Sequence, residues 1–294
     1  MVTEEAGHTN AATTELLSLP KVQRIREIKS ERWVNYPRAR HATHILERVL
    51  DHPRTTRMPS IAIFGDSGMG KTMLMEKFCR EHPTGFDAAN GQFRTPVLPV
   101  QMASRPGERR LYAQILDALG APHNPAARIV DMERSALNLL RAANIQIIVI
   151  DEVHNILSGS YREQRVVLNT LRFLSNDLKA SLVCFGVMEA REAIQGDVQL
   201  ARRFDAFTLP RWAANKGFEE LIGAILRNQP LREKSVLTIK ALRHILQATE
   251  GITARIFRMM NELAIAAVET GDERITDEAV LAWTPLIEAE AAYT

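Results

Sequence analysis

The chain has few of the features that mark secreted, membrane or metal-cluster proteins. It has two cysteines in 294 residues, Cys79 and Cys184, so the sequence indicates neither a disulfide framework nor a cysteine metal site. No apolar run reaches the length of a membrane span, and residues 1–8 lack the basic and apolar regions of a signal peptide. Internal repeats and low-complexity tracts are also missing. These absences predict a globular cytoplasmic protein with no membrane partner.

Charge is nearly balanced over the whole chain. There are 37 Lys or Arg against 35 Asp or Glu, and this net charge of +2 does not by itself indicate a nucleic-acid partner. The distribution is uneven, because residues 21–57 hold ten Lys or Arg and four Asp or Glu. This segment is either a solvated basic face or a surface that contacts phosphates, and composition leaves both interpretations open.

A glycine-rich motif follows a short apolar run at residues 61–64. The motif completes the pattern GxxxxGK[ST], which cradles nucleotide phosphates when it joins a buried strand to a helix. Its glycines let backbone N–H groups approach the phosphates, its lysine carries positive charge to the β and γ oxygens, and its threonine offers a hydroxyl to Mg²⁺. The predicted nucleotide site consists of Gly65, Asp66, Ser67, Gly68, Met69, Gly70, Lys71 and Thr72.

Two carboxylates follow the apolar run at residues 147–150. A buried strand there would place Asp151 at the carboxyl edge of the sheet, where it can hold the water shell of Mg²⁺ together with Thr72. Glu152 would lie beside it and could accept a proton from an attacking water. The alternative is an ordinary solvated strand end. Because a water-activating carboxylate separates an ATPase from a protein that only binds nucleotide, the pair predicts Mg²⁺-dependent hydrolysis with Glu152 as the catalytic base.

The middle of the chain alternates strands with helices, and the end is purely helical. The expected strands are residues 61–64, 96–101, 147–151, 181–186 and 207–209. This succession predicts an α/β fold with a five-stranded parallel sheet covered on both faces, in which an additional strand separates the carboxylate strand from the P-loop strand. The expected divisions are a tail and basic helical segment (1–52), an ATPase core (53–210) and a small helical lid domain (211–294), whose last helix is expected at residues 276–286.

These motifs resemble those of the AAA+ P-loop ATPases and, within them, the TniB-type transposition proteins, relatives of TnsC and MuB. The P-loop and the carboxylate pair are shared by the whole superfamily and specify ATP chemistry only. The narrower resemblance covers about residues 30–290 and is carried by Arg32-Trp33, Tyr36-Pro37, Arg57-Met58-Pro59, residues 97–102 and residues 111–116.

The resemblance implies an ATP- and Mg²⁺-dependent regulator of DNA transposition. Such a protein assembles as a homo-oligomer, a ring or helical filament, on double-stranded DNA with little sequence preference, and ATP hydrolysis controls its release. The implied partners are a TniA-like DDE transposase and a TniQ-like targeting protein, and the implied location is the bacterial cytoplasm, on the nucleoid when bound to DNA.

The resemblance also implies roles for single residues. Arg203, with Arg202 as the alternative, matches the arginine finger that reaches the γ-phosphate of a neighbouring subunit. Arg255 matches the sensor-two arginine of the lid. For each arginine, the alternative is an ordinary surface charge. One position departs from the pattern: where many of these ATPases have a polar sensor-one residue, this chain has Gly186, Val187 and Met188.

Two basic segments after the second and third expected strands, residues 104–110 and 158–165, are candidates for DNA contact. In ring or helical AAA+ assemblies the corresponding loops face the central channel, and no base-reading motif is present, so contacts with phosphates are expected. The alternative is that these are ordinary solvated helix starts. The candidate residues are Arg105, Arg109, Arg110, Tyr161, Arg162 and Arg165.

Two other function classes remain open at this point. A helicase-loader or initiator-like ATPase acting on DNA in replication would share the ATPase core and the lid, although a site-specific initiator normally adds a recognition module and is less well supported. A non-enzymatic scaffold that coats DNA would share the nucleotide site. Turnover of ATP that depends on Glu152 would distinguish an ATPase from such a scaffold.

Overall fold

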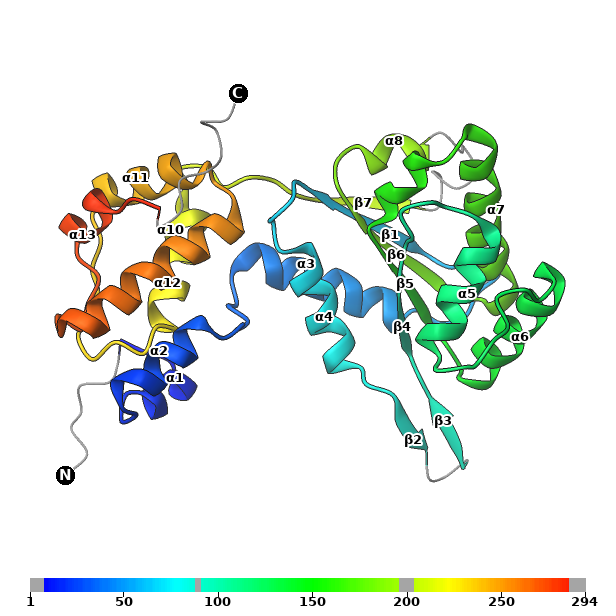
Figure 1. Ribbon diagram of the computed structural model, residues 1–294, viewed down its shortest axis with the longest axis horizontal. Helices are drawn as coiled ribbons and strands as arrows, with labels where there is room; N and C mark the ends of the chain where they lie inside the picture. The colour runs from blue at the N-terminus through cyan, green and yellow to red at the C-terminus, as the bar shows by residue number, and fades with distance from the viewer. Residues whose placement is uncertain (1–7, 88–90, 196–203, 286–294) are drawn as a thin grey trace. The chain divides into compact units, whose positions relative to one another are not determined.

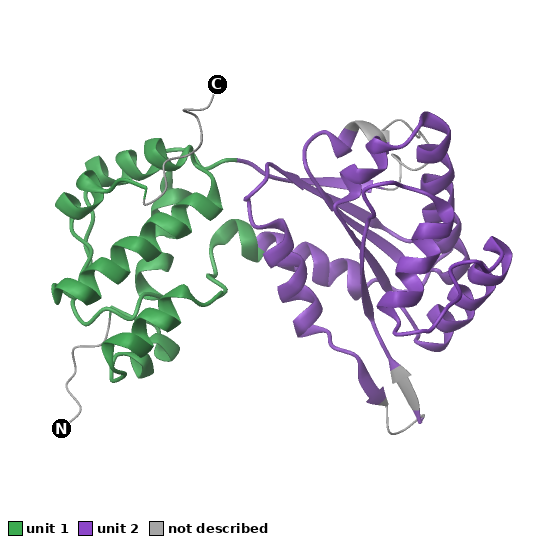
Figure 2. Cartoon of the chain, in the orientation of Figure 1, with its two compact units in different colours: residues 1–40, 211–294 green, residues 41–210 purple. Residues whose placement is uncertain are grey.

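The computed structural model describes residues 8–87, 91–195 and 204–285. The chain divides into two compact units: unit 1 combines residues 1–40 with 211–294, and unit 2 comprises residues 41–210 (Figure 2). The sequence-based division set residues 1–52 apart, whereas in the structure the first 40 residues group with the C-terminal helices. Within the described ranges, no helix is long and apolar enough to cross a membrane.

Unit 2 is built on a parallel five-stranded sheet in the order β4-β5-β6-β1-β7. This confirms the predicted α/β class and the predicted additional strand, because β6 lies between the P-loop strand β1 and the carboxylate strand β5. The strands read as apolar runs because both faces of the sheet are covered. Their bounds are β1 Ser60–Gly65, β4 Val97–Gln101, β5 Ile147–Asp151, β6 Ser181–Gly186 and β7 Phe204–Leu209.

Helices cover both faces of this sheet (Figure 1). One face carries α5 (Glu108–Ala118), α6 (Ile129–Ala142) and α7 (Tyr161–Leu178), and the other carries α4 (Lys71–Glu81) and the part of α3 (Pro37–Leu50) that belongs to unit 2. Three shorter elements also lie in the described part of this unit: the 3-10 helix η1 (Val153–Ser158), α8 (Ala190–Gln195), and a β2–β3 hairpin (Gly85–Asp87 and Gln92–Arg94) that extends away from the sheet.

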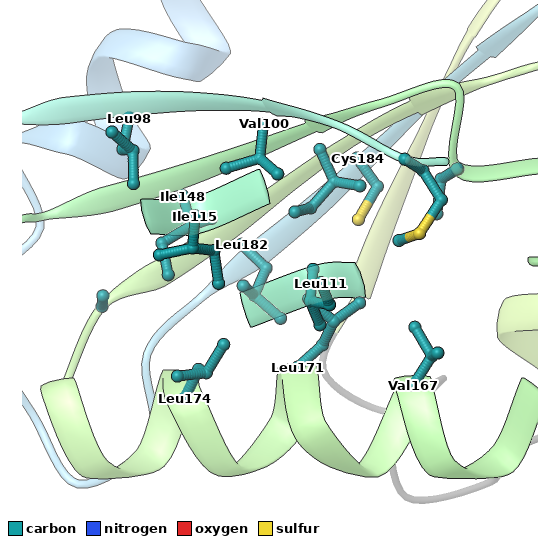
Figure 3. Packing of buried hydrophobic residues seen from close by; sticks show 14 of the residues in the cluster. Leu98, Val100, Leu111, Ile115, Ile148, Val167, Leu171, Leu174, Leu182 and Cys184 are labelled. Atoms are coloured by element: carbon teal, nitrogen blue, oxygen red, sulfur yellow. The ribbon is translucent and has the colours of Figure 1, made fainter. Parts of the chain in front are cut away.

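The core of unit 2 lies between the sheet and α5 and α7 (Figure 3). Alternate residues of each strand point to this side, and α7 meets them with apolar residues spaced three or four apart, so the two periodicities agree. Full burial of each aliphatic side chain contributes about 1.5–3 kcal/mol. The facing side chains include Leu98, Val100, Ile148 and Leu182 from the strands, Leu111 and Ile115 from α5, and Val167, Leu171 and Leu174 from α7.

The regular secondary structure in the described residues of unit 1 is all helical, as predicted for the lid. Its C-terminal helices are α10 (Lys216–Arg227), α11 (Ile239–Thr249), α12 (Thr253–Thr270) and α13 (Asp277–Ala282), and its N-terminal helices are α1 (Ala11–Leu16) and α2 (Lys21–Lys29). The last helix begins where predicted, with Thr276 accepting a bond from the backbone N–H of Ala279, but ends at Ala282 rather than at residue 286. Pro285 disfavours helical backbone at the residue before it and so opposes a continuation to residue 286.

A buried ion pair attaches the N-terminal segment to the lid helices. The Arg24 guanidinium is completely enclosed and makes two 2.6 Å bonds to the carboxylate of Glu273. It also donates a 3.0 Å bond to the carbonyl of Pro230. An enclosed arginine requires such partners, since an unpaired buried charge is strongly destabilising. The apolar side chain of Ile28, one turn along α2, is buried in the same unit. Residues 1–40 therefore belong structurally to unit 1.

Candidate nucleotide-binding site

The P-loop joins β1 to α4 at the carboxyl edge of the sheet. Gly68 and Gly70 have φ angles of 76° and 87°, in the left-handed region where a side chain would be strained. Met69, between them, is buried and donates a 3.3 Å backbone bond to the carbonyl of Asp66. This turn directs the N-terminus of α4 toward the loop, which is the arrangement that binds phosphate.

Gly65 has a different requirement, which is space. A Cβ at this position would lie 2.7 Å from the carbonyl oxygen of Leu209, its partner residue on β7. The obstructing atom is backbone, so a larger residue would force β1 and β7 apart at the base of the P-loop. The first glycine of the motif therefore fixes the loop against the edge strand.

Lys71 is buried and its ammonium lies inside the loop. Nζ donates to the carbonyl oxygens of Gly65 (2.8 Å) and Asp66 (2.9 Å). Burial lowers the pKa of Lys71, and the nearby carboxylates, of which Glu152 has the largest effect, oppose that change. The ammonium is thus held by neutral carbonyls among several acidic groups, ready to exchange these weak partners for phosphate oxygens.

Thr72 and the carboxylate strand meet at the same edge. The Thr72 hydroxyl donates a 3.3 Å bond to Asp151 Oδ2, and the backbone N–H of Glu152 donates a 2.8 Å bond to Asp151 Oδ1. The described residues hold no cluster of three or more His, Cys, Asp or Glu side chains that could bind a metal. A hydroxyl and one carboxylate instead fit Mg²⁺, which takes oxygen ligands and is commonly shared with substrate phosphates. The predicted pair Thr72 and Asp151 is therefore brought together.

Glu152 has an unusual backbone conformation and a partner that the sequence analysis missed. Its φ of 54° is left-handed, which is uncommon for a residue with a side chain and costs about 1–2 kcal/mol. Its Oε2 lies 3.1 Å from Nε2 of His154, in the first turn of η1. The sequence signal for this contact is the pattern Asp-Glu-x-His at the end of the strand. A left-handed turn at the glutamate brings its side chain close to that of the histidine.

The expected sensor-one position has a steric explanation. A Cβ on Gly186, at the end of β6, would lie 2.8 Å from Val153 Cγ1 and 3.0 Å from the Cβ of Ala190. Because η1 packs against this strand end and the first residue of α8 lies beside it, a polar side chain has no room at that residue. Two residues on, Met188 packs against the hydrophobic core.

The two basic segments are joined to each other. The hydroxyl of Ser158 donates to the carbonyl of Ser104, and a Cβ on Gly159 would lie 2.5 Å from Cγ of Pro106. The segments therefore form one surface, which we name the basic rim. Of its residues, only Arg105 lies on a loop, while the others lie among the first five residues of α5 or α7. The basic rim consists of Arg105, Arg110, Tyr161, Arg162 and Arg165, all exposed.

Arg109 lies beside the basic rim but is occupied elsewhere. Its guanidinium donates a 3.0 Å bond to the carbonyl of Pro125, donates to that of Ala127 and lies 3.8 Å from the sulfur of Met132. These contacts attach α5 to the segment that leads into α6. A guanidinium held by internal carbonyls has a structural role, so we separate Arg109 from the other DNA-contact candidates.

The remaining predicted arginines are placed differently. Arg202 and Arg203 lie outside the described residues. Arg255 belongs to unit 1, where its half-exposed guanidinium pairs with Glu250. The segment around it is fixed, because the backbone N–H of Trp212 donates a 2.9 Å bond to the carbonyl of Gly251. The Trp212 indole N–H also donates to the hydroxyl of Thr253 at 3.0 Å.

The strand order and the site together define a class. Solved structures with the same fold include the Aeropyrum pernix ORC2 protein in ADPNP-ADP complexes (16% identity, 87% of this chain and 69% of that chain, TM-score 0.59). They also include the Aeropyrum pernix ORC1 protein with DNA (17%, 88% and 68%, 0.60) and Cdc6p from Pyrobaculum aerophilum (16%, 84% and 67%, 0.59). The fold is that of the AAA+ ATPases.

A comparison of the sequence with family models shows the family to which the chain belongs. A family model described as the bacterial TniB protein matches residues 24–214. The chain therefore belongs to the TniB family of transposition-associated AAA+ ATPases. No curated protein sequence matches the chain.

Proposed function

We propose that this protein is a Mg²⁺-dependent ATPase that assembles as an oligomer on double-stranded DNA and recruits or activates a DDE transposase, with ATP hydrolysis controlling its release. One observation carries the enzymatic part: the carboxylates of Asp151 and Glu152 meet the P-loop at the edge of the sheet, within 3.3 Å of the Thr72 hydroxyl in the case of Asp151. Membership of a transposition-associated family supports the biological part.

Each residue of the site has a defined task in this proposal. Lys71 binds the β and γ oxygens of ATP, while Thr72 and Asp151 hold Mg²⁺, which when bound neutralises phosphate charge. Glu152 accepts a proton from the attacking water, since it is the carboxylate with the largest effect on Lys71 and is not engaged by Thr72. Arg203, or Arg202 in its place, reaches the γ-phosphate of a neighbouring subunit.

Arg255 acts on the nucleotide from the lid, exchanging Glu250 for a phosphate oxygen. Its present ion pair is half-exposed and therefore weak, worth about 0–1 kcal/mol, so that exchange costs little. Coupling a lid arginine and a finger from another subunit to one nucleotide makes hydrolysis depend on assembly.

DNA contact is assigned to the basic rim. Two of its arginines, Arg110 and Arg162, lie in the first turns of α5 and α7, where the helix dipole disfavours positive charge by about 0.3–1 kcal/mol per residue. Glu108 and Glu163 offset part of that cost. Arginines concentrated at positions that do not favour helix stability fit a surface selected for an anionic partner. Because the exposed groups are guanidinium groups and one phenol, the expected contacts are with phosphates and carry little sequence preference.

A helicase-loader or initiator-like role in replication is the second candidate. The likeness to ORC and Cdc6 structures favours it, and one of those structures contains DNA. The family match over residues 24–214 favours transposition. The two candidates share the nucleotide chemistry and differ in the protein partner, so binding to a TniA-like transposase, rather than to a replicative helicase, distinguishes them.

Replacing Glu152 with Gln tests the proposal. The amide keeps the size of the side chain but cannot accept a proton, so ATP turnover should fall at least about a hundredfold while ATP binding persists. Complexes formed with ATP on duplex DNA should then outlast those of the unaltered protein. The matched control is Glu76→Gln, an exposed carboxylate on α4. Normal turnover in Glu152→Gln would remove Glu152 from the chemistry.

A further inference from the structure

The basic segment at residues 21–57 contains both internal and exposed charges. Arg24 is enclosed by its ion pair in unit 1, and Arg54 donates to two backbone carbonyls at 3.0 and 3.3 Å. Guanidinium groups held in this way serve the fold. On α3, three side chains are instead exposed and make no ion pair or side-chain hydrogen bond within the described residues. We name them the α3 row: Arg40, His44 and Arg48.

The α3 row occupies one face of a single continuous helix. Its members are four residues apart, and positions with that spacing lie one above the other on an α-helix. At about 1.5 Å per residue the row is about 12 Å long. One strand of duplex DNA carries about three to four phosphates over that length, at about 3.4 Å each. Other positions of α3 are apolar and buried, among them Ala42, Leu46 and Val49. The helix is therefore anchored, and the row is a line of nitrogen groups that matches a phosphate backbone in length.

No carboxylate in the described part of the chain pairs with the α3 row. Oε1 of Glu47 lies 3.0 Å from Nε2 of His82, at the end of α4. Asp51 follows the helix and is exposed, and no ion pair joins it to Arg48 among the described residues. The first turn of α3 has no acidic residue, although the helix dipole favours negative charge there. An uncompensated basic row of this kind favours an anionic partner.

The α3 row and the basic rim belong to opposite faces of the sheet. α3 lies on the face that carries α4, with the ring of His41 edge-on to that of Phe207 of β7 at 5.5 Å between centroids, whereas α5 and α7 cover the other face (Figure 1). Every subunit of a closed or helical homo-oligomer presents the same surface to the axis. Duplex DNA is stiff, with a persistence length of about 150 base pairs. A duplex along the basic rims therefore does not bend around each subunit to the α3 row.

We propose that the α3 row is a second phosphate-binding surface, which holds a second DNA duplex while the basic rim holds the first. The inference goes beyond the proposed function and rests on it for the position of the first duplex. Guanidinium and imidazole N–H groups on an exposed helix face contact phosphate oxygens, so the second duplex is bound with little sequence preference. An assembly with both surfaces occupied bridges two segments of DNA.

Capture of a second duplex tests the inference. One biotinylated duplex is immobilised, protein is added with a non-hydrolysable ATP analogue, and retention of an unrelated fluorescent duplex is measured against salt. Arg40→Ala with Arg48→Ala should weaken capture at least about tenfold and lower its salt slope by about 0.9 per lost contact. Binding to the immobilised duplex and the thermal midpoint should stay close to those of the unaltered protein. Arg40→Lys with Arg48→Lys should keep much of the capture, since an ammonium also binds phosphate.

The matched control is Arg134→Ala with Lys240→Ala, two exposed cations on α6 and α11, which changes the net charge equally and should leave capture unchanged. No capture by the unaltered protein, normal capture by Arg40→Ala with Arg48→Ala, or an equal loss in the control would each overturn the inference.

A neighbouring subunit is the other occupant that the test separates. If Arg40→Ala with Arg48→Ala prevents nucleotide-dependent assembly without DNA, measured by sedimentation, the α3 row contacts protein and the inference is overturned. A failure of the proposed function has a different result: Arg105→Ala with Arg110→Ala would then bind the first duplex normally. If the basic rim is correctly assigned, that variant should keep a residual affinity for duplex that the α3-row substitutions remove.

Discussion

Replacing Glu273 with Gln should destabilise unit 1 by a large and specific amount. The substitution removes the charge that compensates Arg24, whose guanidinium is completely enclosed and lies 2.6 Å from both carboxylate oxygens. Breaking a buried pair by removing one partner costs about 3–5 kcal/mol, because the other charge stays buried and unpaired. The Glu273 side chain is 11% exposed, which favours the lower end, about 3 kcal/mol.

Tryptophan fluorescence during urea unfolding measures this loss selectively. All three tryptophans, Trp33, Trp212 and Trp283, belong to unit 1. The midpoint should move to lower urea in Glu273→Gln, and the double substitution Arg24→Met with Glu273→Leu should recover most of the stability, because apolar replacement removes both charges together. Glu250→Gln, which breaks a half-exposed pair of the same unit, should cost no more than about 1 kcal/mol.

The pH dependence has a definite sign. The hydrogen bonds from Arg24 are the main reason that the pKa of Glu273 is lowered from its ordinary value of 4.5. A carboxylate with a lowered pKa in the folded state contributes stability above its ordinary pKa and loses it as pH falls toward the folded value. The difference between the unaltered protein and Glu273→Gln should therefore be full at pH 7 and shrink below pH 4.5. A difference under about 1 kcal/mol at pH 7, matching that of the exposed pair, would refute the reasoning.

Three further predictions concern the site. Lys71→Ala should abolish tight ATP binding, measured with a fluorescent analogue, because the β and γ phosphate charges lose the ammonium that compensates them; wild-type affinity would remove the site assignment. The double substitution Arg105→Ala with Arg110→Ala should weaken duplex binding equally on unrelated sequences and reduce the slope of log K against log salt by about 0.9 per lost contact. Arg109→Ala should instead lower the thermal midpoint. The reverse pattern would contradict the separation of Arg109 from the basic rim. Arg203→Ala should lower turnover but spare ATP binding, and mixing it with Glu152→Gln should restore some activity; no recovery at any ratio would argue against action between subunits.

The features that the sequence predicted well are local ones. Two strand ends were predicted from the motifs that follow apolar runs, namely the P-loop and the paired carboxylates. The alternation of strands and helices then predicted the parallel sheet with its additional strand. These predictions succeed because a buried parallel strand must be apolar on both faces, and a phosphate loop needs glycines at set positions.

The features that the sequence did not predict depend on contacts between distant residues. Arg24 counts as a basic residue in composition, yet it is enclosed by a partner 249 positions away. Arg109 has the same spacing as a DNA-contact candidate but donates to carbonyls on a different segment. His154 could be read as a polar residue after a strand, and its approach to Glu152 depends on the left-handed turn at Glu152. In each case the sequence shows the chemistry of the side chain but not the residue that it contacts.

The most direct test of the central claim is electron microscopy of the protein with duplex DNA, with ATP, with a non-hydrolysable analogue and without nucleotide. The account predicts ordered rings or filaments on DNA with the analogue, fewer with ATP because hydrolysis releases them, and none without nucleotide. The Lys71→Ala protein should form none under any of these conditions. Ordered assemblies on DNA that form equally well without nucleotide would contradict the claim that ATP controls assembly.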